Sequence, residues 1–140
     1  MIGLAPSAAA ATVLAGASGI PSETLAKLVH DLDHGRRSWL NEAIGPDTLV
    51  VVDEAGMADT LTLDRVITHA LAQGASVRLI GDDQQLAAVG AGGVLRDIAT
   101  THGAVRLSEV VRFSDPAEAE ATLALRDGDA SALGFYLDRD

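Results

Sequence analysis

The sequence predicts an α/β protein in which a parallel sheet is flanked by helices. Strand-like runs occur at Leu49–Val52, Val77–Ile80 and Val105–Leu107, and the first is a continuous Leu-Val-Val-Val run typical of strands buried on both faces. Segments with the apolar spacing of helices lie between these runs. The connections are short, as expected where parallel strands alternate with crossover helices.

Length and composition limit the number of domains and the classes of function that the chain can have. The chain has 140 residues, which suits one domain, and its 10 basic against 20 acidic residues give a net charge of −10. Such an acidic balance disfavours non-specific coating of DNA but leaves room for a narrow DNA channel. The absence of cysteine excludes disulfides and zinc-thiolate sites and suits a cytoplasmic protein. We expect neither a membrane span nor a signal peptide, because no long apolar run exists and no cation precedes Lys27.

The first third of the chain predicts one strand and two helices. Ile2–Ala5 reads as a short buried strand, after which Ser7 caps an alanine-rich helix that runs to about Leu14. A second helix is expected from Pro21 and Ser22 to Gly35, and a loop from His34 to Asp47. The apolar face of the second helix consists of Leu25, Leu28, Val29 and Leu32.

The rest of the chain alternates in the same way. After the strand Leu49–Val52, Asp59 caps a helix that ends at Gly74, and the strand Val77–Ile80 follows. The remaining expected elements are a helix near Val94–Thr101, a third buried strand Val105–Leu107, a helix from Asp115-Pro116 to Arg126, and a short helix Ser131–Leu137.

An acidic pair follows the most apolar strand. Asp53 and Glu54 come directly after Val52, and ligands of open α/β sheets bind outside the carboxyl ends of the strands. An aspartate there suits a magnesium ion held through water, and a neighbouring glutamate suits activation of an attacking water. The alternative is a solvated acidic turn without function.

Two further signals follow later strands. In Gly81-Asp82-Asp83-Gln84-Gln85-Leu86, the Gln85 amide suits a terminal phosphate oxygen, and Asp82 suits the metal shell or the support of the loop. The alternative is a polar turn. Arg112 suits stabilisation of charge on a transferring phosphoryl group, the alternative being a surface ion pair.

Together these segments resemble motifs II, III and IV of superfamily 1 DNA helicases, in the RecD-like branch and most closely the motor domain of conjugal transfer relaxase-helicases. Leu4-Ala5-Pro6-Ser7 looks like motif Ia of the same family. The resemblance implies that residues 1–140 form one incomplete RecA-like, AAA-type P-loop ATPase domain that uses Mg-ATP to move along single-stranded DNA. It implies magnesium binding by Asp53, water activation by Glu54, γ-phosphate contacts by Gln85 and Arg112, and DNA contact by Pro6 and Ser7.

The chain departs from the family at its start. The family's phosphate loop, Gly-x-x-x-x-Gly-Lys-Ser/Thr, does not occur, and the single lysine, Lys27, lies in a helical pattern without a glycine nearby. The second RecA-like domain is missing as well. We therefore interpret the chain as a fragment of the motor that is inactive alone. The alternatives are a non-catalytic remnant or pseudo-ATPase interaction module and, less well matched, a receiver domain phosphorylated at Asp53, which would need an acidic pair where Pro6 and Ser7 stand.

Three weaker patterns are assigned no function. Gly90-Ala91-Gly92-Gly93 fails as a dinucleotide motif because Leu95 stands where the third glycine belongs. His30 and His34 have the spacing of a zinc-protease pair but lack its glutamate and a third ligand, so a solvated helix end is expected. Tyr136 is expected to pack rather than to nick DNA.

Overall fold

The computed structural model describes residues 1–83, 85, 93–107, 115–126, 128–130 and 132–137. It divides into two compact units, Met1–Gly103 and Ala104–Asp140, and each is described by itself. The candidate site residues that the structure places all belong to the first unit.

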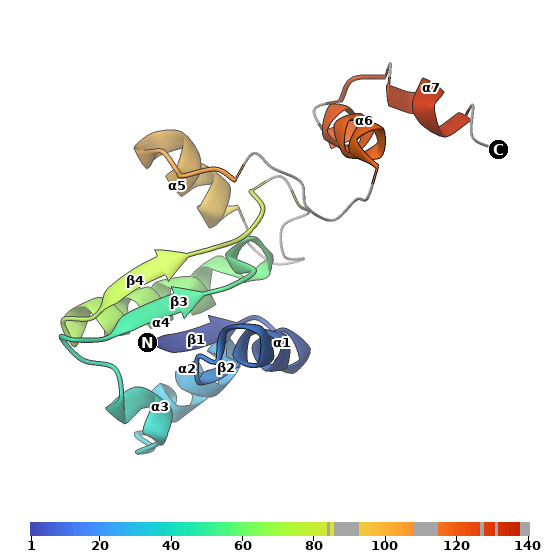
Figure 1. Ribbon diagram of the computed structural model, residues 1–140. Helices are drawn as coiled ribbons and strands as arrows, with labels where there is room; N and C mark the ends of the chain where they lie inside the picture. Colours follow the sequence, from blue (N-terminus) through green and yellow to red (C-terminus); the bar gives the residue numbers. More distant parts are fainter. Residues whose placement is uncertain (84, 86–92, 108–114, 127, 131, 138–140) are drawn as a thin grey trace. The chain divides into compact units, whose positions relative to one another are not determined.

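The first unit is built on a sheet of four parallel strands (Figure 1). These are β1 (Ile2–Ala5), β2 (Ser22–Thr24), β3 (Leu49–Val52) and β4 (Ser76–Leu79), in the order β2-β1-β3-β4. Ile2 lies opposite Val50 and Val50 opposite Val77, so β3 is paired on both sides. The predicted class, a parallel sheet with flanking helices, is confirmed.

Helices cover both faces of this sheet. Side chains alternate along a strand, so Leu4, Val50 and Val52 point to one face and pack with helices α2 (Leu25–Asp33), α3 (Trp39–Glu42) and α4 (Thr60–Ala72). Leu28, Leu40, Leu63 and Val66 complete this core. Helix α1 (Ala8–Ser18) lies on the opposite face, where its Leu14 approaches Gly3. Helix α5 (Val94–His102) contacts the short 3-10 helix η1 (Ala55–Met57).

The predicted caps are confirmed by hydrogen bonds. The Ser7 hydroxyl accepts from the backbone N–H of Ala10 at 3.2 Å. The Asp59 carboxylate accepts from the N–H of Thr62 at 2.9 Å, and hydrogen bonds from Thr62 hold the pKa of Asp59 below its usual range. Each cap satisfies backbone N–H groups that the first turn of a helix leaves unpaired.

Two predicted boundaries between β1 and β3 were wrong. Ser22–Thr24 do not begin the second helix but form strand β2, because the Gly3 N–H donates to the Pro21 carbonyl at 2.9 Å and so starts a parallel ladder with β1. The helix begins at Leu25 instead, with Thr24 as its cap. The predicted loop after Gly35 contains α3, which a Ser38–Asn41 capping box starts.

The second unit contains helices α6 (Pro116–Arg126) and α7 (Ala132–Leu137), which pack on each other. The hydroxyls of Thr122 and Tyr136 lie 2.8 Å apart, so Tyr136 takes part in this packing. The predicted strand Val105–Leu107 is wrong: the segment is irregular and Val105 is 99% exposed.

Membrane insertion has no candidate in the described part of the chain. None of its helices combines the length and the apolar character that crossing a bilayer requires.

Candidate functional site

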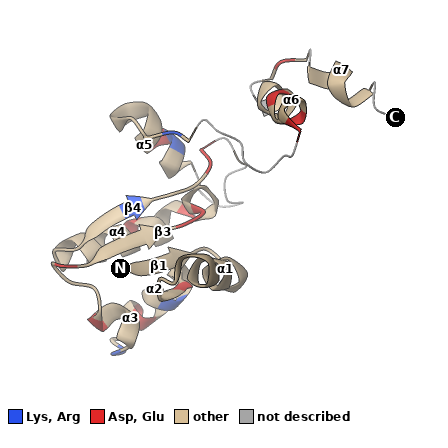
Figure 2. Cartoon of the chain, in the orientation of Figure 1, with Lys and Arg blue, Asp and Glu red and all other residues tan. Residues whose placement is uncertain are grey.

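Three loops with predicted functional residues meet at one edge of the sheet. All four strands are parallel, so their carboxyl ends lie on the same side. Pro6 and Ser7 follow β1, Asp53 and Glu54 follow β3, and the Asp82 loop follows β4. Acidic residues accordingly appear where β3 and β4 end (Figure 2). The arrangement brings together residues that are far apart in the sequence.

The acidic pair lies beside the point where the strand order reverses. From β1 the chain proceeds outward to β2, whereas from β3 it proceeds outward to β4 on the other side. Crevices at such switch points are where open α/β sheets bind ligands. The N–H of Asp53 donates to the Leu4 carbonyl at 2.8 Å, so the pair is anchored directly to the end of β1.

Glu54 has an unusual backbone conformation. Its φ of 51° and ψ of 37° are left-handed, and among the described residues no other non-glycine has a positive φ. The Asp53 carboxylate accepts a hydrogen bond from the Glu54 N–H at 3.0 Å, which fixes both residues in one tight turn. Strained backbone of this kind is concentrated at functional sites, so the observation supports a functional role for Glu54.

The loops after β3 and β4 are hydrogen bonded to each other. The Ile80 N–H donates to the Val52 carbonyl at 2.8 Å, and the Ala55 N–H donates to the Ile80 carbonyl at 2.9 Å. These two bonds extend the β3–β4 pairing past the ends of the strands. The Asp53-Glu54 turn and the Asp82 loop are therefore held as one structure.

A small pocket lies along the loop after β4. Its volume is about 120 Å³, and it is lined by Gly56, Asp82, Asp83, Gln85, Gly93, Leu95 and Arg96. The Arg96 guanidinium donates from Nε to the Asp83 carbonyl at 2.8 Å and so connects α5 to the loop. Pockets for whole small molecules measure about 300–1,000 Å³. The pocket formed by the described residues is therefore too small to enclose a whole nucleotide.

The donor set is compatible with a water-mediated magnesium site. Within the described ranges, no three His, Cys, Asp or Glu side chains gather closely enough to hold a metal ion. Magnesium needs no such cage, because it keeps several waters and takes only one or two carboxylates together with substrate phosphates. Asp53, half-buried at the end of β3, fits this requirement. Arg112 lies outside the described residues.

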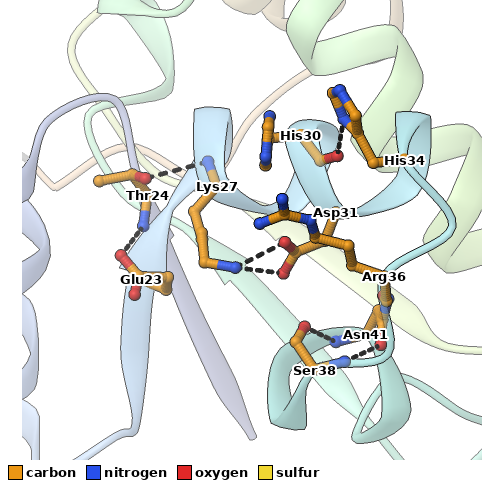
Figure 3. A network of polar contacts seen from close by, with 9 residues as sticks. All are labelled: Glu23, Thr24, Lys27, His30, Asp31, His34, Arg36, Ser38 and Asn41. Carbon is orange, nitrogen blue, oxygen red and sulfur yellow. Dashed lines mark hydrogen bonds and ion pairs between the residues drawn. The ribbon is translucent and has the colours of Figure 1, made fainter.

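The single lysine is committed to a buried ion pair (Figure 3). Lys27 Nζ lies 2.6 Å and 2.5 Å from the two carboxylate oxygens of Asp31, one turn further along α2. The Asp31 side chain is 0% exposed, and hydrogen bonds from Lys27 and then from Ser38 hold its pKa below the ordinary value of 3.8. The sequence signal for this pair, a carboxylate between Leu28 and Leu32 on an apolar face, was not recognised.

The two histidines lie close together at the end of α2. His30 and His34 are exposed at the end of α2, with ring centroids 4.1 Å apart. Nδ1 of His34 lies 2.8 Å from the His30 carbonyl oxygen, so this nitrogen is occupied by the end of its own helix. The rings thus belong to a solvated helix end, as the sequence indicates.

Comparisons with known proteins agree with this picture. A family model described as an AAA domain matches residues 1–140. The chain is 31% identical over 137 residues to the conjugal transfer protein TraA of Rhizobium radiobacter, which covers 97% of this chain. It is 30% identical over 133 residues to a probable conjugal transfer protein TraA of Sinorhizobium fredii, covering 95% of this chain. The chain spans 12% of the length of each of these two relatives.

Proposed function

The chain belongs to the AAA domain family, and on that basis we propose that it is part of an ATP-dependent DNA helicase motor from a conjugative relaxase-helicase. In this proposal the motor couples hydrolysis of Mg-ATP to movement along single-stranded DNA. The observation that carries it is the Asp53-Glu54 turn at the strand-order reversal, anchored to β1 and hydrogen bonded to the end of β4. The similarity to conjugal transfer proteins over nearly the whole chain supports the same assignment.

We assign to the site residues the roles that the resemblance to the helicase family implies. Asp53 would hold the magnesium ion through its water shell, and that ion would neutralise charge on the phosphates. Glu54 would orient the attacking water and accept its proton as the water oxygen bonds to the γ-phosphorus and the bond from that phosphorus to the departing ADP oxygen breaks. Gln85 would donate its amide N–H to a γ-phosphate oxygen, Asp82 would join the metal shell or support the loop, and Arg112 would stabilise the developing charge.

The loop after β1 is the proposed DNA contact. Ser7 is exposed and Pro6 half-buried, and both lie at the same sheet edge as the acidic pair. A contact there would place single-stranded DNA next to the nucleotide-responsive turn, since Asp53 is hydrogen bonded to β1. The motor's remaining grip on DNA is assigned to a second RecA-like domain.

We assign the phosphate loop to a segment outside this chain. Among the described strands none pairs with the outer edge of β4, and such an edge accepts a further strand readily. A parallel strand on that edge would bring its own carboxyl end beside the loop with Asp82 and Gln85. Phosphates bound there would then meet the side chains that we assign to them.

A second candidate is a non-catalytic remnant or pseudo-ATPase interaction module. The commitment of Lys27 to Asp31 favours it, because that lysine is unsuited to phosphate binding. A receiver domain is less well supported, since Pro6 and Ser7 follow β1 where an acidic pair is required. Labelling of Asp53 by acetyl phosphate would revive the receiver hypothesis.

Nucleotide titration separates the two main candidates. We expect the 140-residue chain to bind Mg-ATP more weakly than about 1 mM, because the missing loop supplies most of the backbone contacts to phosphate. Isothermal titration calorimetry measures this affinity. A micromolar dissociation constant would contradict it. A longer chain with an upstream phosphate loop should bind tightly if the motor assignment is correct, and weakly if the protein is a remnant.

A further inference from the structure

Two glycines lie where the loops after β3 and β4 approach each other closely. A Cβ atom added to Gly56 would lie 2.7 Å from the backbone oxygen of Asp82. A Cβ added to Gly81 would lie 3.0 Å from the backbone nitrogen of Ala55 and 3.1 Å from that of Gly56. Backbone therefore meets backbone at this point, and the Leu95 side chain lies beside both glycines, with its Cδ2 3.1 Å from the Cβ added to Gly81 and 3.7 Å from the Cβ added to Gly56.

The need for glycine here arises from space and not from backbone conformation. Neither Gly56 nor Gly81 is among the glycines with a positive φ. Alanine at these positions avoids the strain of a left-handed backbone, so the penalty that we consider is the contact of its methyl group with the neighbouring backbone and with Leu95. Substitution of alanine at either position therefore inserts one methyl group between the two loops.

The contact directly follows the residue to which we assign water activation. Glu54 holds its left-handed conformation immediately before Ala55, whose N–H is bonded to the Ile80 carbonyl at 2.9 Å. Gly56 follows and lies against the carbonyl of Asp82. Asp82 in turn precedes Gln85 by three residues. A shift of the loop after β4 thus displaces the backbone next to Glu54 through direct backbone contacts.

We propose that Gly56 and Gly81 are positioning residues that hold Glu54 at the distance from the Asp82–Gln85 loop that hydrolysis requires. This inference rests on the proposed ATPase function. Through this contact, the position of the phosphate-contacting loop determines the position of the water-activating carboxylate. We assign neither glycine a contact with the reacting phosphate, so we expect their effect on the reaction to pass through the positions of Glu54 and the loop after β4.

The first test is Gly56→Ala in the complete motor. Ordinary contact begins near 3.4 Å, so the methyl group must push the Asp82 carbonyl away by more than half an ångström. A misplacement of this order lowers kcat by roughly 10- to 100-fold. We expect the KM for ATP to change by less than about threefold, because most ground-state phosphate contacts are assigned to the phosphate loop. Gly81→Ala, with its milder contact, should show a smaller loss in the same direction.

Two control variants separate positioning from general destabilisation. Gly45→Ala places a methyl group in open space and should leave both kcat and thermal stability unchanged. Gly3→Ala crowds Ser22 and Leu14 and should lower the melting temperature without lowering kcat. A Gly56→Ala protein that is folded and has kcat within about twofold of the wild type would overturn the inference.

A second measurement tests the contact without any hydrolysis. In the chain as given, Gly81→Ala should speed hydrogen exchange at the Ala55 amide, bonded to Ile80, at least about tenfold. Exchange at the Asp53 amide, bonded to Leu4, should remain as in the wild type. Unchanged exchange at Ala55 would refute the contact. If the complete motor hydrolyses no ATP while exchange at Ala55 increases, the proposed function has failed and the positioning contact stands.

Discussion

Glutamine in place of Glu54 is expected to lower kcat for ATP hydrolysis in the complete motor by about 10²–10⁴-fold, the usual contribution of a general base. The side chain keeps its size and its place after β3, but an amide cannot accept the proton of the attacking water. Nucleotide affinity should stay within about threefold, because Asp53 and the phosphate loop remain. Steady-state hydrolysis with single-stranded DNA and equilibrium binding of a fluorescent ATP analogue measure the two quantities.

Glu42→Gln is the matched control for this substitution. Glu42 lies on α3 and pairs with Arg37 2.8 Å away, and both side chains are exposed. Its loss should leave hydrolysis and binding as in the wild type. Hydrolysis at the wild-type rate by Glu54→Gln would show that another group activates the water. A parallel loss of nucleotide binding would assign Glu54 to the ground-state complex instead.

Local patterns predicted the elements whose contacts are local. The Leu49–Val52 run contains enough β-branched and aliphatic side chains to specify a buried strand, and the Ser7 and Asp59 caps act within one turn of their own helices. Strand β2 has no such pattern, because Ser22–Thr24 becomes a strand only through pairing with Gly3 and its neighbours. Val105–Leu107 shows the opposite case, in which an apolar pattern exists but the segment is irregular.

The candidate site likewise has some features that local sequence patterns predict and others that they do not. The rule that ligands bind at strand carboxyl ends was enough to select Asp53, Glu54 and the Asp82 loop, which the structure places at one edge. The left-handed backbone of Glu54 carries no sequence signal, since glycine and asparagine are the residues that usually indicate it. The contact of Gly56 with Asp82 depends on the register of β3 with β4, which no local pattern encodes.

The ion pair between Lys27 and Asp31 was also not predicted from local patterns, and its removal is expected to have a large effect on stability. Lys27→Met should lower the melting temperature by about 5–10 °C, because it leaves the Asp31 carboxylate buried without its main partner. Lys27 is 44% exposed and Asp31 0% exposed, so the cost falls on the carboxylate. Thermal unfolding followed by circular dichroism measures the shift. Since the hydrogen bonds of Lys27 in the described part of the chain go to Thr24 and Asp31, nucleotide-dependent properties should not change.

Arg37→Met provides the comparison, because it also removes one cation from an ion pair but from an exposed one. Its melting temperature should fall by less than about 2 °C. Replacing both members of the buried pair, Lys27→Met with Asp31→Leu, should restore most of the stability that Lys27→Met loses. An equal effect of Lys27→Met and Arg37→Met would contradict the buried pair.

The pH dependence of stability gives an independent test of the same ion pair. Lys27 holds the pKa of Asp31 below 3.8, so the pair stabilises the fold above that pH and this contribution is lost as the pH falls through the lowered pKa. The Lys27→Met variant lacks this contribution to stability at every pH. The difference in melting temperature between wild type and variant should therefore shrink as the pH is lowered from neutrality to below 3.8. A difference that stays constant or widens over that range would mean that Asp31 does not carry the charge opposite Lys27.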